Sequence, residues 1–361
     1  MLKKAVKNVQ DRTKSKREKE DELLSQSVVN IKVVGAGGAG GNTIERMSEV
    51  GILGASTLAI NTDAQDLLST HADQRLLIGK TLTKGLGSGS DPQIGEASAK
   101  ESSKELKDML KGTDLMFITC GLGGGTGTGS TPHVAQIGKE VGALTIAVVT
   151  LPFTVEGKKR IENALEGLSR LRDHADTIIV IPNDKILELA PDLPINAAFK
   201  VADEVLTNAV KGITEMITKA GLINLDFADL KTILKKGGAA MIGLGESDST
   251  EAGETRALEA VENALSSPLL DVDISNAKRA LINVVGSSDM TLREAEMIVE
   301  TVSGKIHPDA HIIWGAMLEE KMPKNHIQAM VVIAGGRFPF LDDIDAVRRN
   351  KTIDLGIEFT A

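Results

Sequence analysis

The sequence predicts an α/β protein with a mostly parallel sheet covered by helices, followed by a long helix and a second, smaller α/β unit. Two observations carry this prediction. Short apolar runs with little polar alternation are linked by amphipathic helical patterns, which is typical of strands buried on both faces of a parallel sheet. One long helical pattern then separates two series of such runs. At 361 residues the chain is long enough for two domains with full cores.

The first series of apolar runs begins just after residue 27. Its predicted strands are at residues 28–34, 57–60, 75–78, 115–120, 143–150 and 177–181. Helical patterns lie between most of them, as parallel strands require. We therefore assign residues 27–196 to one domain.

A long helix and a second series follow. Apolar residues recur at helical spacing over 197–218, and we assign 197–220 to a central helix that connects the two units. The C-terminal α/β domain is expected over 221–336. Its predicted strands are 239–244, 280–285, 311–316 and 328–333, and its predicted helices are 254–265 and 292–302.

Composition excludes several classes of protein. The net charge of −9 argues against general nucleic-acid binding, and seven Phe, one Trp and no Tyr argue against stacking of bases on aromatic side chains. The single cysteine, Cys120, excludes an internal disulfide and a multi-cysteine metal site; we expect it to be a small buried residue in a reducing cytoplasm. We find no run of about 18 apolar residues and no signal peptide, so we expect neither a membrane span nor export.

A glycine-rich segment between a strand and a helix predicts a phosphate site. Residues 121–129 read G-L-G-G-G-T-G-T-G, after the strand at 115–120 and before a predicted helix at 130–140. Backbone N–H groups and a helix N-terminus in this arrangement form an anion cradle. Glycine permits the backbone conformations and the close approach that such a cradle needs.

Two further glycine loops modify that prediction. Residues 35–42 satisfy G-x-G-x-x-G, and Asp63 follows at the distance of a ribose-binding carboxylate, which alone indicates a Rossmann-type dinucleotide fold. Residues 85–92 form a third loop before a helix. Three donor-rich loops suit a triphosphate better than a pyrophosphate. The absence of G-x-x-x-x-G-K-[ST] excludes a P-loop NTPase.

Three other segments carry side chains suited to a nucleoside. Glu156 and Arg160 are four residues apart, suited to a sugar hydroxyl and a phosphate, although a surface ion pair explains them equally well. Phe199 and Asp203 share the same spacing and can stack a purine and accept two N–H donors, which guanine offers and adenine does not. Asn183, at a strand end, can meet the opposite edge of the base. Without the other segments, Phe199 would be interpreted as a core residue and Asp203 as a solvated side chain.

A pair of carboxylates and an amide follow the central helix. Asp226 and Asp229, with Asn224 beside them, can polarise a water molecule, although Asp226 also fits the N-cap of a helix beginning at residue 227. The long helix is expected to carry this acid loop, residues 221–229, well away from the glycine loops. It could still reach the phosphates of another chain.

Together these segments resemble the FtsZ family of tubulin-like prokaryotic cell-division GTPases, across about residues 28–335. Residues 124–129 are similar to the tubulin-superfamily signature. The segments 35–42, 61–63, 151–160, 181–183 and 221–229 match the family in kind and order. The resemblance implies a tubulin-like fold with a Rossmann-like GTPase domain.

The resemblance also implies the residues of a GTP or GDP site. They are Gly38, Ala39, Gly40, Gly41, Asn42, Gly127, Thr128, Gly129, Glu156, Arg160, Asn183, Phe199 and Asp203. Glu156 is expected on the ribose, Arg160 near sugar and phosphate, and the last three on guanine. Mg²⁺ is expected with the triphosphate, with Asp63 and Gln65 as candidate ligands.

In this family the loop carrying Asn224, Asp226 and Asp229 enters the nucleotide site of the next subunit. The resemblance therefore implies that the catalytic site is completed by head-to-tail polymerisation with copies of the same chain. The filament is expected in the cytoplasm, at the midcell division ring.

The terminal segments are expected to be separate from the domains. Residues 1–26 carry Lys3, Lys4, Lys7, Arg12, Lys14, Lys16, Arg17 and Lys19, and form either a solvated extension or a contact with an anionic membrane or acidic partner. Residues 337–361 form a short tail, in which 342–345 and 355–359 are candidates for a peptide that binds division proteins or a membrane anchor. These ends are more similar to archaeal than to bacterial members.

Other functions stay open at this level. A related tubulin-like filament could serve cell shape or DNA partition, or bind GTP while polymerising poorly. A nicotinamide-dependent oxidoreductase would rest on residues 35–40 and Asp63 alone.

Overall fold

The computed structural model describes residues 29–189, 194–219, 221–249, 254–270 and 272–335. The charged extension at 1–26 and the tail at 337–361 lie outside the described residues, so the expectations about them stay predictions. Within the described part of the chain, no helix is both long and apolar enough to cross a membrane.

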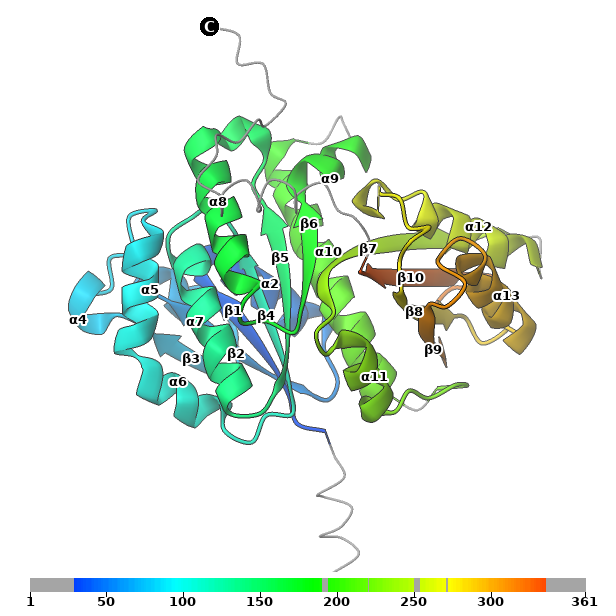
Figure 1. The fold of residues 1–361 in the computed structure, drawn as a ribbon, viewed down its shortest axis with the longest axis horizontal. Coiled ribbons are helices and arrows are strands. Elements are labelled where there is room, and N and C mark those ends of the chain that lie inside the picture. Colours follow the sequence, from blue (N-terminus) through cyan, green and yellow to red (C-terminus); the bar gives the residue numbers. More distant parts are fainter. Residues whose placement is uncertain (1–28, 190–193, 220, 250–253, 271, 336–361) are drawn as a thin grey trace, which may run out of the picture.

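A single ten-stranded sheet runs through the whole molecule, in the order β3-β2-β1-β4-β5-β6-β7-β10-β8-β9 (Figure 1). Its first seven strands in this order are parallel, β10 is antiparallel to both β7 and β8, and β8 is parallel to β9. The strands are β1 Ile31–Ala36, β2 Ala55–Asn61, β3 Gln74–Leu77, β4 Leu115–Gly121, β5 Leu144–Leu151, β6 Thr177–Pro182, β7 Gly238–Ser247, β8 Arg279–Gly286, β9 His311–Leu318 and β10 Ile327–Ala334.

Every strand predicted from an apolar run is present, with boundary shifts of a few residues. The largest shifts are of three residues: β1 begins at Ile31 rather than at residue 28, and β7 ends at Ser247 rather than at residue 244. Asn30 instead joins the edge of the sheet, where its N–H donates to the Asp114 carboxylate at 2.9 Å. The two predicted units are joined by direct pairing of β6 with β7 over Thr177–Ile179, a continuity that the sequence did not indicate.

Helices cover both faces of the sheet. They are α2 Gly37–Val50, α3 Ala64–Ser69, α4 Lys80–Thr83, α5 Pro92–Glu101, α6 Ser103–Leu110, α7 Thr126–Glu140, α8 Lys158–Leu171, α9 Asn183–Leu189, α10 Ile195–Thr218, α11 Phe227–Leu234, α12 Glu254–Leu265 and α13 Leu292–Ser303, with 3-10 turns η1 Thr154–Glu156 and η2 Pro268–Leu270. One apolar core lies under α5 to α8, α12 and α13, and the other lies under α2, α10 and α11. Cys120 is fully buried in the first core, where burial raises the pKa of its thiol to about 12.

The central helix α10 crosses one face of the sheet from end to end. Its 24 residues span about 36 Å at the usual helical rise. Near its N-terminus, Phe199 and Asp203 lie beyond the carboxyl ends of the parallel strands. At its other end, the Thr218 hydroxyl donates to the carbonyl oxygen of Leu53, just before β2 begins. The helix therefore places its two ends, and the segments attached to them, at opposite edges of the sheet.

Helix α7 begins earlier than its sequence predicts, at Thr126 instead of residue 130. Glycine disfavours helix, but α5 and α7 approach so closely that larger residues do not fit. A Cβ on Gly129 would lie 2.0 Å from the carbonyl oxygen of Pro92, and one on Gly95 would lie 2.3 Å from that of Gly125. Close packing of two helices, rather than local propensity, thus fixes where α7 begins.

Candidate nucleotide site

A cavity of about 470 Å³ opens at the carboxyl ends of the parallel strands. This is the edge at which open α/β sheets bind ligands. The loops after β1, β2, β4 and β5 line it, together with Asn183 after β6 and the first turns of α10. The N-termini of α2 and α7 also face it, so backbone N–H groups and two helix dipoles favour an anion there.

The phosphate end is built from the three predicted glycine loops. The residues lining the cavity from these loops are Gly37, Gly38, Ala39, Gly87, Ser88, Gly89, Ser90, Gly121, Gly124, Gly125, Thr126 and Gly127. The Thr126 hydroxyl lies 2.7 Å from the Thr62 hydroxyl and 3.0 Å from that of Ser88, which ties the loops at 121–129 and 85–92 to the turn after β2. These hydrogen bonds therefore hold the phosphate-binding loops in place before any ligand binds.

The nucleoside end combines an aromatic ring with polar groups. Phe199 is 41 % exposed and packs edge-on against Phe153, with ring centroids 5.0 Å apart, so it lines the cavity instead of filling the core. Asn183 and Asp203 lie in the same lining. Burial raises the pKa of the Asp203 carboxyl to about 7.

Glu156 and Arg160 form the ion pair that their spacing predicts, and both line the cavity. The Glu156 carboxylate also accepts a hydrogen bond from the Phe153 N–H at 2.9 Å. This second contact fixes its position at the cavity wall, which a surface pair alone would not do.

The residues expected at the GTP site divide into those that line the cavity and those outside its lining. Gly38, Ala39, Gly127, Glu156, Arg160, Asn183, Phe199 and Asp203 line it. Gly40, Gly41, Asn42, Thr128 and Gly129 do not belong to the lining.

Two of the residues outside the lining, Gly40 and Thr128, stabilise the wall of the cavity. A Cβ on Gly40 would lie 2.6 Å from the carbonyl oxygen of Thr119, so glycine here allows α2 to pack against β4. The Thr128 hydroxyl accepts a hydrogen bond from the Gly123 N–H at 2.8 Å and fixes the loop from inside. The glycine pattern signals both ligand approach and helix packing, and sequence alone does not separate the two.

Several lining residues were absent from the predicted set. They are Ala36, Gly37, Asn61, Asp66, Gly121, Leu122, Gly124, Gly125, Thr126, Thr150, Pro152 and Ala202, together with Leu86, Gly87, Ser88, Gly89 and Ser90 of the third glycine loop. Asn61 carried a usable signal, because it is a polar residue at the end of an apolar strand. Its amide donates to the Asp66 carboxylate at 2.7 Å.

The two metal candidates differ in position. Asp63 lines the cavity, but its carboxylate caps α3 by accepting from the N–H groups of Gln65 and Asp66. The Gln65 side chain is exposed and outside the lining. Among the described residues no group of three or more His, Cys, Asp or Glu side chains could hold a metal. The cavity therefore fits Mg²⁺ held mainly by phosphate and water, with one or two carboxylates nearby.

The acid loop lies at the opposite edge of the sheet (Figure 1). Asp226 caps α11 by accepting from the Ala228 N–H at 3.0 Å, as predicted. The end of α11 contacts the start of β6, where the Thr177 hydroxyl donates to the Leu234 carbonyl at 2.5 Å. Asn224, Asp226 and Asp229 are all exposed, and none belongs to the cavity lining.

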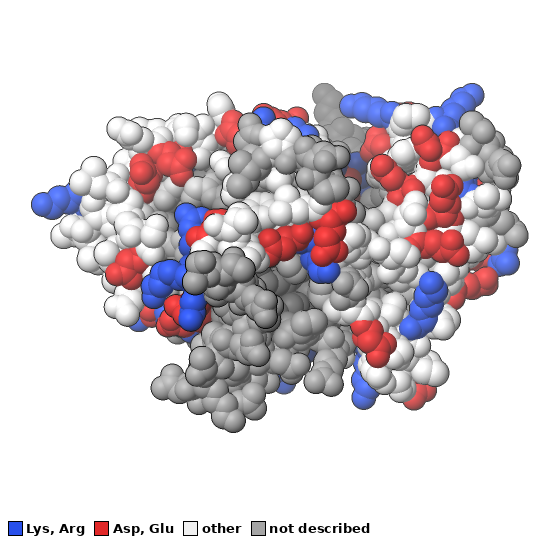
Figure 2. Space-filling view, turned by 90° about the horizontal axis from the view of Figure 1, so that it is seen from above, with Lys and Arg blue, Asp and Glu red and all other residues white. Residues whose placement is uncertain are grey.

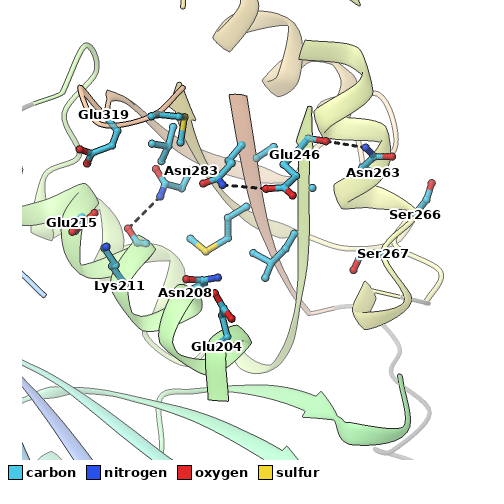
Figure 3. Close-up of a pocket in the computed structure, with 18 of the residues that line it drawn as sticks. Glu204, Asn208, Lys211, Glu215, Glu246, Asn263, Ser266, Ser267, Asn283 and Glu319 are labelled. Atoms are coloured by element: carbon cyan, nitrogen blue, oxygen red, sulfur yellow. Dashed lines mark hydrogen bonds between the residues drawn. The ribbon is translucent and has the colours of Figure 1, made fainter. Parts of the chain in front are cut away.

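A second cavity, of about 740 Å³, lies between α10 and the C-terminal strands (Figure 3). Four carboxylates line it against a single lining cation, Lys211; they are Glu204, Glu215, Glu246 and Glu319. No glycine loop of the N-terminal sheet reaches it. Because it lacks a donor-rich loop of this kind, we take the cavity at the carboxyl ends of the parallel strands as the nucleotide candidate.

Two family models cover most of the described chain. Residues 30–191 match the Tubulin/FtsZ family GTPase domain, and residues 238–337 match the FtsZ family C-terminal domain. The interval between them contains α10 and the acid loop. A nicotinamide-dependent oxidoreductase is excluded by these matches.

Relatives of known identity agree over nearly the whole length. "Cell division protein FtsZ 1" of Thermococcus kodakarensis is 59 % identical over 318 residues, covering 88 % of this chain and 84 % of its own. The protein of the same name in Methanocaldococcus jannaschii is 58 % identical over 338 residues, covering 93 % and 91 %. A solved structure described as "FtsZ dimer, empty (M. jannaschii)" superposes with a TM-score of 0.83 at 58 % identity, covering 89 % of this chain and 92 % of that one. The chain therefore belongs to the FtsZ family of tubulin-like cell-division GTPases.

Proposed function

We propose that this protein binds and hydrolyses GTP and polymerises head-to-tail into filaments of the cytoplasmic division ring at midcell. Membership of a GTPase family makes a guanine nucleotide the expected ligand of the cavity. The relatives named as cell-division proteins favour division over a role in cell shape or DNA partition.

The separation of the acid loop from the nucleotide cavity is the observation that carries the proposal. The two lie at opposite edges of one sheet, joined by a helix about 36 Å long. In a single chain, the acid loop thus lies too far away to act on a nucleotide in the cavity of the same chain. Stacking a second copy in the same orientation brings the two together. Such a heterologous contact does not close and so generates a filament.

The chemistry follows from the groups that line the two halves. The glycine loops and helix N-termini hold the phosphates, Glu156 and Arg160 hold the sugar, and Phe199, Asn183 and Asp203 hold guanine. Mg²⁺ held by the triphosphate, beside Asp63, would neutralise charge on the phosphates when bound. Asp226 and Asp229 of the next subunit polarise the attacking water, with Asn224 orienting it.

Turnover of the filament follows from the same geometry. The nucleotide is enclosed between two subunits, so loss of the γ-phosphate changes the contact itself and weakens it. A solved relative described as a dimer is consistent with self-association of this kind.

Nucleic acid is not an expected partner. Figure 2 shows the molecule of Figure 1 from above. On this face Lys and Arg lie in separate small groups, and Asp and Glu gather over the C-terminal half.

Sedimentation of the purified protein with GTP, GDP or ATP tests the proposal, with phosphate release measured in parallel. We expect pelleting and phosphate release with GTP, little of either with ATP, and turnover per subunit that rises with protein concentration. Turnover independent of concentration would place the whole active site within one chain and contradict the proposal.

Asp226→Ala tests the assignment of the acid loop. The variant should bind GTP with unchanged affinity while losing turnover, because Asp226 is outside its own cavity. Loss of GTP binding instead would show that the loop serves the nucleotide site of its own chain.

A further inference from the structure

The base end of the cavity contains two hydrogen-bond acceptors that no described residue satisfies. Asn183 is 4 % exposed, and its Oδ1 receives no hydrogen bond within the described part of the chain. Asp203 lines the same cavity, and burial is the one cause of the raised pKa of its carboxyl group. A buried acceptor without a donor is destabilising, so both groups favour a ligand that donates N–H groups.

The two acceptors differ in one chemical respect. The amide of Asn183 cannot titrate, whereas the carboxyl group of Asp203 can gain a proton. Ionised, a carboxylate only accepts hydrogen bonds; protonated, it donates one and keeps part of its acceptor capacity. Guanine presents two donors side by side, N1–H and the exocyclic amine. Only the ionised form of Asp203 can accept from both.

We propose that nucleotide recognition in this cavity is coupled to loss of a proton from Asp203, so that acid weakens guanine binding and narrows the preference for guanine over adenine. A protonated carboxyl group pairs with an edge that offers an acceptor beside a donor. Adenine has such an edge at N1 and its exocyclic amine. The proposal rests on the proposed function, because it concerns the same guanine site.

The charged groups around Asp203 do not provide a competing partner. Asp63, Asp66, Glu156 and Arg160 line the same cavity, and Arg160 is paired with Glu156. On the helices packed against α10, Arg46 of α2 lies 3.7 Å from Glu204, and Asp184 of α9 accepts from the Thr154 N–H and hydroxyl. Three of the four lining charges besides Asp203 are acids, and the one cation, Arg160, is already paired with Glu156, so the described lining offers Asp203 no cation to hold it ionised.

The pH window follows from the direction of the shift. The pKa of Asp203 is raised to about 7, so the group is ionised above that pH and protonated below it. Guanine needs the ionised form; its affinity is therefore constant above pH 7 and falls as pH drops through that value. The ionised fraction falls about tenfold between about pH 8 and about pH 6, and the affinity falls with it.

Calorimetric titration with GDP and ADP tests the proposal without turnover. The full-length protein and Asp203→Asn are compared at about pH 8 and about pH 6. The amide cannot titrate, while the nucleotide phosphates, with a pKa near 6, titrate equally in both titrations. We expect the GDP affinity of the unmodified protein to fall about tenfold more than that of the variant, and its preference for GDP over ADP to narrow.

Equal pH dependence in the two proteins would overturn the proton coupling. Failure of the unmodified protein to bind GDP at about pH 8 would overturn the guanine site itself, and with it the proposed function. A second measurement does not depend on the variant. GDP binding at about pH 6 in buffers of different ionisation enthalpy should show proton release beyond that of the phosphates, and no such release would contradict the proposal.

Discussion

The two edges of the parallel sheet hold the two halves of the proposed active site in different ways. At the cavity edge, glycine backbone and hydroxyl groups are packed against one another before a ligand binds. At the other edge, Asn224, Asp226 and Asp229 are exposed on a loop anchored by the buried side chains of Leu225 and Leu230. One half depends on close packing and the other on charge.

This contrast shows how one chain can carry an incomplete active site at little cost. Exposed carboxylates stay hydrated, and the cavity does not carry the added negative charge of Asp226 and Asp229, which would repel a triphosphate. In the proposed filament, the two become a reaction site only when a second copy covers the nucleotide. Adding a methyl group at the cavity edge should therefore lower stability, and removing a charge at the acid edge should lower turnover.

Removal of charge at the acid edge should have the largest effect. Asp226→Asn keeps the N-cap of α11, since Asn caps as well as Asp. We expect GTP turnover to fall at least about 100-fold with melting temperature and GTP affinity unchanged. The measurements are phosphate release, thermal unfolding and nucleotide titration. Asp273→Asn, which keeps an acceptor for the Ser275 N–H outside both halves of the site, is the matched control and should keep turnover near normal.

A methyl group at the cavity edge should have the next largest effect. Gly129→Ala should lower the free energy of unfolding by roughly 2–3 kcal/mol, because its Cβ would lie 2.0 Å from the Pro92 carbonyl oxygen. Helix propensity alone predicts the opposite sign. Gly124→Ala in the same loop meets nothing within 4 Å and should be nearly neutral. Denaturant unfolding of the two variants would reveal an error if their stabilities were equal.

The smallest expected effect concerns Asp203 in the nucleotide-free protein. Its raised pKa means that its contribution to stability is fully present below about pH 4 and is lost as pH rises through about 7. Asp203→Asn should therefore be more stable than the unmodified protein at about pH 8, by about 1–2 kcal/mol after allowance for solvent screening. The difference should shrink towards about pH 4. Thermal unfolding across this range checks the prediction, and an unchanging difference would contradict it.

Strand positions were predictable because buried parallel strands are nearly continuous apolar runs. The run that became β4, for example, is buried from Leu115 to Cys120. The pairing of β6 with β7, which joins the two units into one sheet, left no such pattern. It is set by tertiary packing around Thr177, whose hydroxyl also binds the end of α11.

The candidate site was predictable in kind more than in detail. Glu156, Arg160, Phe199 and Asp203, which spacing and residue type singled out, line one cavity, and their binding of GTP stays a proposal. Glycine was ambiguous, because Gly129 serves helix packing while Gly124, a few residues earlier, faces open space. The distance from the acid loop to the cavity followed from the length of one helix. The completion of the site by a neighbouring copy stays a proposal.

Mixing two inactive variants tests the central claim most directly. Gly124→Glu, whose Cβ would meet no protein atom within 4 Å, should put a charged side chain into the cavity and block GTP binding while the acid loop stays intact. Asp226→Asn keeps the cavity and loses the acid. If each active site is shared between two chains, the mixture should hydrolyse GTP where neither variant does alone. If the mixture shows only the sum of the two separate rates, although both variants are folded and sediment together, the shared active site is contradicted.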